Sequence, residues 1–147
     1  MGGATNIGSF LRRFGPGGLD LRIAGLCDAG EEDEFRRAII DARLGAVRTR
    51  DEMELLGFFV CDPDLEGELI RGLGPAGVER VLEAQGEFAK LRTFQRQPAW
   101  RGRPIEHQLR RFMGTFSGRK INTAARLVEE LDPDRAPRPL ARLLGYL

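Results

Sequence analysis

The sequence predicts an α/β fold built on a parallel sheet, followed by a helical C-terminal extension. Two apolar runs, Leu19–Cys27 and Gly57–Cys61, have the length of buried strands. A helical pattern lies between them, which makes the pair a βαβ unit with parallel strands. Helical patterns dominate the rest of the chain, so we expect a core over residues 1–75 and an extension over residues 76–147.

The expected helices follow from apolar spacing and from the glycines and prolines that end them. Their inward faces are Ile7, Phe10, Leu11 and Phe14; Phe35, Ala38, Ile39 and Ala42; Leu65, Leu69, Ile70 and Leu73; Val78, Val81, Leu82 and Phe88; Ile105, Leu109, Phe112 and Met113; Ile121, Ala124, Val128 and Leu131; and Leu140, Leu143, Leu144 and Leu147. Residues 46–56 form a charged connection with a short helical turn. Arg92–Pro104 has no apolar periodicity and carries two prolines, which predicts a loop.

Composition suits a globular domain, and charge is unevenly distributed. The chain has 147 residues, 41% hydrophobic and 31% charged, with a net charge of +1. Residues 51–88 hold ten acids against two arginines, and residues 89–121 hold nine basic residues against one acid. An acidic half beside a basic half suits metal binding next to phosphate binding, although solvated mixed surfaces are common.

The cysteines and the hydropathy pattern indicate which cellular compartment to expect for the protein. Cys27 and Cys61 each end an apolar run, where a cysteine acts as a small core hydrophobe. The sequence shows neither a signal peptide nor an apolar run long enough to span a bilayer. We therefore expect a cytoplasmic protein without a disulfide, a zinc site or membrane association.

Acidic residues follow both expected strands. Asp28 stands at the end of the first strand with Glu31 and Glu32 after it, and Asp64 and Glu66 follow the second. Parallel strands deliver these side chains to one sheet edge, where carboxylates suit Mg²⁺ or Mn²⁺. Such ions could activate water and stabilise the leaving oxygen of a phosphodiester. Asp28 and the acids after it equally suit a helix cap.

Basic and aromatic residues alternate after residue 89. Trp100 lies among arginines that could meet phosphates while aromatic rings stack on bases, or it could anchor the loop to the core. Lys120, at a helix start, could neutralise charge on a phosphoryl oxygen. The candidate nucleic-acid-binding residues are Arg92, Arg96, Trp100, Arg101, Arg103, Arg110, Arg119 and Lys120.

Two strands make a small sheet, because sheets usually have about four to six strands and parallel edges need pairing. We expect that the sheet is N-terminally incomplete, or that a homodimer or another partner completes its edge.

Blocks spread over nearly the whole chain resemble a known family. MGGATNIG, GLCDAGEE, DLEGELIRGLG, TFQRQPAWRGRP, QLRRFMG and SGRK look like actinobacterial Toprim (topoisomerase–primase) nucleotidyl transferase/hydrolase domain proteins. These are related to the Toprim part of the overcoming-lysogenisation-defect (OLD) family of ATP-dependent endonucleases. The resemblance implies a Toprim-like (Rossmann-like) fold and Mg²⁺-dependent cleavage or transfer at nucleic-acid phosphodiesters, with DNA as the expected partner.

The resemblance also implies roles for individual residues. The family's D-x-D motif corresponds to Asp28-Ala29-Gly30, which keeps the first acid, and Glu31 or Glu32 could substitute for the second. Glu66 in DLEGEL corresponds to a later acid, and Lys120 in SGRK corresponds to a C-terminal lysine. Asp28, Glu66 and Lys120 would then be catalytic, and Asp28, Glu31, Glu32, Asp64 and Glu66 metal ligands.

The family's first-strand glutamate motif, E-G-x-S-[DE], is absent from this sequence. We therefore expect weak or no activity from the chain as written, and no ATP site in it. The alternative is a nucleic-acid-binding or scaffolding module without catalysis. A phosphoryl-accepting pocket of the receiver type would need a hydroxyl side chain ending another strand, and GFFVCDPD offers none.

Overall fold

A computed structural model describes residues 6–115 and 120–147 of the chain, except for the side chains of residues 120–122. The fold is mixed α/β and the chain forms two compact units. The first unit consists of residues 1–65 and 138–147, and the second of residues 66–137. Within the described residues, no helix is long and apolar enough to cross a membrane.

The sheet of the first unit consists of two parallel strands, as predicted. Strand β1 (Gly25–Asp28) pairs with β2 (Phe58–Cys61), and Gly25 lies opposite Phe58 while Asp28 lies opposite Cys61. In the described part of the chain, these strands pair only with each other. Both cysteines are free and buried, which agrees with their expected place in the core.

Strand β1 is shorter than the predicted strand Leu19–Cys27. Leu19 and Leu21 are exposed, and their backbone amides donate hydrogen bonds to Arg13 and Phe14 at the end of helix α1 (Ile7–Phe14). The segment before β1 is therefore held by the end of a helix rather than by a neighbouring strand. Apolar composition alone does not distinguish these two kinds of extended backbone.

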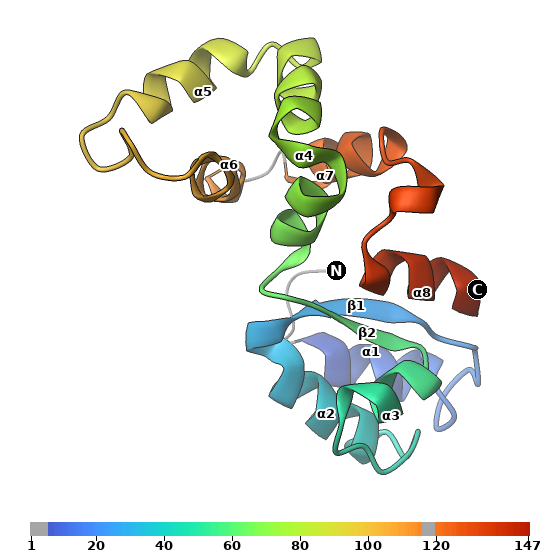
Figure 1. The fold of residues 1–147 in the computed structure, drawn as a ribbon. Helices are drawn as coiled ribbons and strands as arrows, with labels where there is room; N and C mark the ends of the chain where they lie inside the picture. Colours follow the sequence, from blue (N-terminus) through green and yellow to red (C-terminus); the bar gives the residue numbers. More distant parts are fainter. Residues whose placement is uncertain (1–5, 116–119) are drawn as a thin grey trace. The chain divides into compact units, whose positions relative to one another are not determined.

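Three helices lie on one face of the sheet (Figure 1). They are α1, α2 (Glu32–Asp41), which follows the short 3₁₀ helix η2 (Ala29–Glu31), and α3 (Arg50–Leu55). Their apolar side chains form one core with the strands. Its buried members are Ile7, Leu11, Cys27, Phe35, Ala38, Ile39, Val47, Met53, Phe58 and Val60.

Helix α8 (Arg138–Tyr146) lies on the opposite face of the same sheet (Figure 1). The Tyr146 ring packs edge-on against Phe59 of β2, with ring centroids 6.1 Å apart. Arg138 and Arg142 form ion pairs with Glu54 at N–O distances of 2.6 and 3.5 Å. These contacts join α8 to the first unit, whereas the sequence assigned residues 138–147 to the C-terminal extension.

The second unit is helical. Helix α4 (Leu65–Ala84) is kinked at Gly74, which has a φ of +70° and is followed by Pro75. The kink lies next to residue 75, where the sequence predicted the end of the core. After it come α5 (Phe88–Gln95), α6 (Ile105–Gly114), α7 (Lys120–Glu129) and the 3₁₀ helix η3 (Pro133–Arg135). Leu69, Val78, Leu82, Leu91, Leu109 and Leu127 are fully buried.

The segment Arg92–Pro104 is partly helical, so the prediction of a loop was wrong for its first residues. Helix α5 continues to Gln95, so Arg92 and Phe94 lie on a helix. Arg92 lies over the Phe88 ring at 4.5 Å and the Thr93 hydroxyl donates to the Ala89 carbonyl at 3.0 Å. Both contacts join residues one helical turn apart, and the spacing of apolar residues in the sequence does not reveal such contacts.

Candidate functional site

The carboxyl edge of the sheet brings together the segments that follow β1 and β2. The Leu65 amide donates a hydrogen bond of 3.0 Å to Asp28 Oδ1, and the Ala29 amide donates one of 3.2 Å to the Pro63 carbonyl. Asp64, which is half-buried, immediately precedes Leu65 in the chain. Asp28 and the Asp62–Asp64 segment therefore belong to one hydrogen-bonded edge.

Asp28 also lies at the N-terminus of a helical segment. It is the N-cap residue of η2, and its own amide donates to Glu31 Oε2 at 3.4 Å in a capping-box arrangement. The side chain accepts from Leu65, so it links the end of β1 to the start of α4. These contacts agree with the helix-cap interpretation of Asp28.

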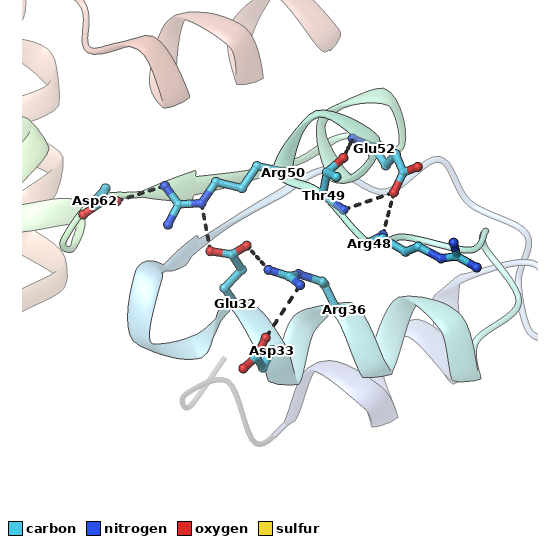
Figure 2. Close-up of polar contacts among 8 residues, drawn as sticks. All are labelled: Glu32, Asp33, Arg36, Arg48, Thr49, Arg50, Glu52 and Asp62. Atoms are coloured by element: carbon cyan, nitrogen blue, oxygen red, sulfur yellow. Dashed lines mark hydrogen bonds and ion pairs between the residues drawn. The ribbon is translucent and has the colours of Figure 1, made fainter.

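Glu32 is the centre of an ion-pair network at this edge (Figure 2). Its side chain is 11% exposed and accepts hydrogen bonds from Arg36 and from Arg50, the latter at 2.8 Å. Arg50 extends the network to Asp62, 2.9 Å away, and Arg36 lies 3.8 Å from Asp33. Two guanidinium groups thus balance the carboxylates of Glu32 and Asp62.

A capping box determines where Arg50 lies. Thr49 is the N-cap of α3 and its hydroxyl accepts from the Glu52 amide at 3.2 Å. The Glu52 carboxylate in turn accepts from the amides of Arg48 and Thr49 at 2.6 and 3.1 Å. Arg50 is therefore the first residue of α3, and its side chain reaches Glu32 and Asp62 (Figure 2).

The network shifts the pKa values of its members. Burial acts to raise the pKa of Glu32, but hydrogen bonds from Arg36 and Arg50 outweigh burial and hold that pKa below the ordinary value of 4.5. Hydrogen bonds to Asp62 and Glu32 raise the pKa of Arg50. Burial, together with the negative charges of Glu31, Glu32 and Asp28, raises the pKa of the Cys27 thiol to about 12.

The remaining predicted site residues are placed as follows. Glu66 is half-buried in the first turn of α4 and belongs to the second unit. Helix α7 begins at Lys120, but the Lys120 side chain and all of Arg119 lie outside the described residues. Among the residues described, no three or more His, Cys, Asp or Glu side chains form a group able to hold a metal ion.

Arginines occupy some of the carboxylate oxygens at this edge that a magnesium ion would need. Hard cations take oxygen ligands, whereas the oxygens of Glu32 and Asp62 already accept from guanidinium groups. Arg36 and Arg50 were not among the site residues predicted from the sequence. Spacing of four residues from Glu32 points to Arg36, but nothing local points to Arg50, which is 18 residues from Glu32.

The predicted nucleic-acid-binding residues differ in their pairing. Arg92 lies 3.5 Å from Glu79 and is held by the Phe88 ring and Gln95. Arg96, Arg101 and Arg103 are exposed and have no ion-pair partner among the described residues, and the same holds for Arg111, which was not among the predicted residues. Arg110 is also exposed. Trp100 is half-buried and stacks on Phe94.

Comparison of the chain with protein-family models, with curated proteins and with solved structures gave no match.

Proposed function

We propose that this protein binds nucleic acid through the arginines of its second unit. The observation that carries the proposal is the contrast between two sets of arginines. Arg36 and Arg50 are neutralised by carboxylates, whereas Arg96, Arg101, Arg103 and Arg111 are exposed and have no carboxylate partner among the described residues. Uncompensated guanidinium groups attract phosphates and release the counterions that phosphates hold.

The test is salt-dependent binding to a labelled oligonucleotide. The double variant Arg101→Gln/Arg103→Gln should bind more weakly, and the slope of log K against log salt should decrease in magnitude by about two. The matched control is Arg37→Gln/Arg43→Gln, which removes two exposed arginines of the first unit that also have no ion-pair partner among the described residues. Equal losses in both double variants, or no binding at low salt, would contradict the proposal.

A second candidate function is phosphodiester chemistry of the Toprim type, with the sheet as part of a Toprim-like fold. It is supported by the parallel strands and by Asp28 at their carboxyl edge, hydrogen-bonded to the segment that follows β2. Asp28, Glu66 and Lys120 remain the proposed catalytic residues, with Asp28, Glu31, Glu32, Asp64 and Glu66 as proposed ligands of Mg²⁺ or Mn²⁺. Because arginines occupy part of this edge, we expect weak or no cleavage by the chain alone.

Plasmid nicking in Mg²⁺ or Mn²⁺ tests the second candidate. Asp28→Asn is the informative variant, because an amide oxygen can still accept from the Leu65 amide while the charge is lost. Metal-dependent nicking that Asp28→Asn abolishes would establish the enzyme. Nicking that survives the substitution would exclude Asp28 as a catalytic residue.

A further inference from the structure

The second unit contains a groove between helices α5 and α6. Its volume is about 600 Å³, which is within the range of sites that hold small organic ligands. Aromatic, cationic and hydroxyl side chains line it together. The aromatic residues are Phe94, Trp100 and Phe112, and the cationic ones are Lys90 and Arg111.

Three aromatic rings form one wall of this groove. The Phe94 and Trp100 rings stack with an interplanar angle of 26° and centroids 5.1 Å apart. Phe94 also contacts Phe112, which is 5% exposed, at a centroid distance of 5.5 Å. Phe94 lies between Phe112 and Trp100, so Trp100 is one end of the series, and it is half-buried, as Phe94 is. A planar ring in this position can extend the stack.

Hydrogen bonds hold Trp100 in place before any ligand arrives. The buried Gln108 side chain donates to the Trp100 carbonyl at 2.8 Å and accepts from the Gln95 amide group at 2.9 Å. The Trp100 and Arg101 amides both donate to the Gln97 carbonyl at 2.9 Å. The turn that carries Trp100 is therefore fixed to both helices, which lowers the entropy lost on binding.

Cations stand beside the aromatic wall. Arg111 is exposed and has no ion-pair partner among the described residues, whereas Lys90 is paired with Glu87 at 2.9 Å. An aromatic stack with an uncompensated guanidinium group beside it matches a flat ring joined to a phosphate. Bases that are paired in a duplex do not offer their faces to such a wall.

We infer that the groove between α5 and α6 binds an unpaired base of single-stranded nucleic acid, stacked against Trp100, with an adjacent phosphate at Arg111. That the ligand is a nucleic acid rests on the proposed function. The groove adds that the strand is single and that one of its bases stacks on Trp100. Stacking is tolerant of sequence because every base has a π-face. The groove therefore selects an unpaired strand rather than a particular base.

The chain has one tryptophan, so its fluorescence reports on the groove directly. Titration of the full chain with a single-stranded eight-nucleotide DNA should quench Trp100 emission. The same sequence as a duplex should bind without comparable quenching, and a mononucleotide should quench only at much higher concentration. Equal affinity for mononucleotide and strand would overturn the assignment to a strand.

Substitution separates stacking from charge. Trp100→Ala should weaken binding of a fluorescein-labelled single strand, measured by anisotropy, about tenfold. The matched control is Phe14→Ala, which removes a half-buried ring that contacts Phe10 in the first unit and should leave affinity unchanged. Should circular dichroism show that Trp100→Ala is unfolded, Arg111→Gln replaces it. That exposed variant should lower affinity and leave quenching at saturation intact.

These experiments distinguish an error in the assignment of a base to the groove from an error in the proposed function. Salt-dependent binding that is sensitive to Arg101 and Arg103 but leaves Trp100 emission unchanged would overturn the assignment of a base to the groove and leave the proposed function standing. Absence of any binding would overturn both proposals.

Discussion

Glu32 is the residue on which the charge balance of the sheet edge depends. It is almost fully buried and accepts from Arg36 and Arg50, so its carboxylate must be ionised for both guanidinium groups to be paired. Its folded-state pKa lies below 4.5, so the stabilisation is complete above that pH and is lost as the pH falls through the folded-state value.

Glu32→Gln should therefore lower the free energy of unfolding by about 1–2 kcal/mol at pH 7, because the two ion pairs with arginines become hydrogen bonds from charged donors to a neutral amide. The difference from the unsubstituted protein should shrink as the pH falls below 4.5, the ordinary value of the carboxyl group. Urea unfolding at several pH values measures both effects. Glu34→Gln, in the same helix, is the control, and a difference that is constant down to pH 3 would contradict the expectation.

Cys27 should be unreactive in the folded protein. The residue is 3% exposed and its thiol has a pKa raised to about 12, while the thiolate is the reactive form. In a Cys61→Ala variant, Ellman's reagent at pH 8 should label Cys27 slowly without denaturant and rapidly in urea. Rapid labelling of the native variant would show that the strand edge opens.

Local patterns predicted most helices and the parallel relation of the strands. They placed the start of β1 and the end of α5 too early in the sequence. The helix carrying Phe35 and Ile39 and the strand Phe58–Cys61 are recognisable because their apolar residues recur at the spacing of their own backbone. The start of β1 depends instead on hydrogen bonds from Leu19 and Leu21 to α1. Such contacts between elements leave no local signal.

Gly57 is the glycine whose replacement should affect the sheet most. It has a φ of +88°, and a Cβ atom there would lie 2.5 Å from the Tyr146 ring. Gly57→Ala should cost about 1–2 kcal/mol for the backbone and about 1–3 kcal/mol more for the steric conflict. Gly86, with a φ of +73°, likewise lies just after the end of a helix and has open space around its Cβ position, so Gly86→Ala should show the backbone cost alone.

A Tyr146→Ala background checks that explanation by thermal or urea unfolding. Without the ring, the cost of Gly57→Ala should fall to that of Gly86→Ala. An unchanged cost in the double variant would mean that the conflict lies elsewhere, for example with the Ile23 carbonyl 3.1 Å away.

At the scale of the whole molecule, the division of the chain was the hardest property to predict. Residues 138–147 group with the first unit because Tyr146 packs on Phe59 and because Arg138 and Arg142 pair with Glu54. Each contact joins residues more than 80 positions apart, as the Arg138–Glu54 pair at a separation of 84 shows. Acid spacing along the sequence likewise indicated a shared sheet edge but not its arginines.

Self-association through the sheet edge remains a prediction. Among the described residues β1 and β2 pair only with each other, and exposed Leu19 and Leu21 precede β1. Unpaired strand edges favour pairing with a further strand. Light scattering coupled to gel filtration should give a mass above 16.4 kDa that depends on concentration, and Leu21→Lys should lower it. A monomer at all concentrations would contradict the prediction.

The position of α8 has a consequence for synthesis. A ribosome makes residues 66–137 before it makes residues 138–147, yet the sheet of the first unit needs α8 to cover one of its faces. The helical unit can therefore acquire its fold while the nascent chain still lacks α8. Until that helix emerges, Phe59 stays uncovered by Tyr146, so residues 1–65 are made before the second unit but are completed only after it.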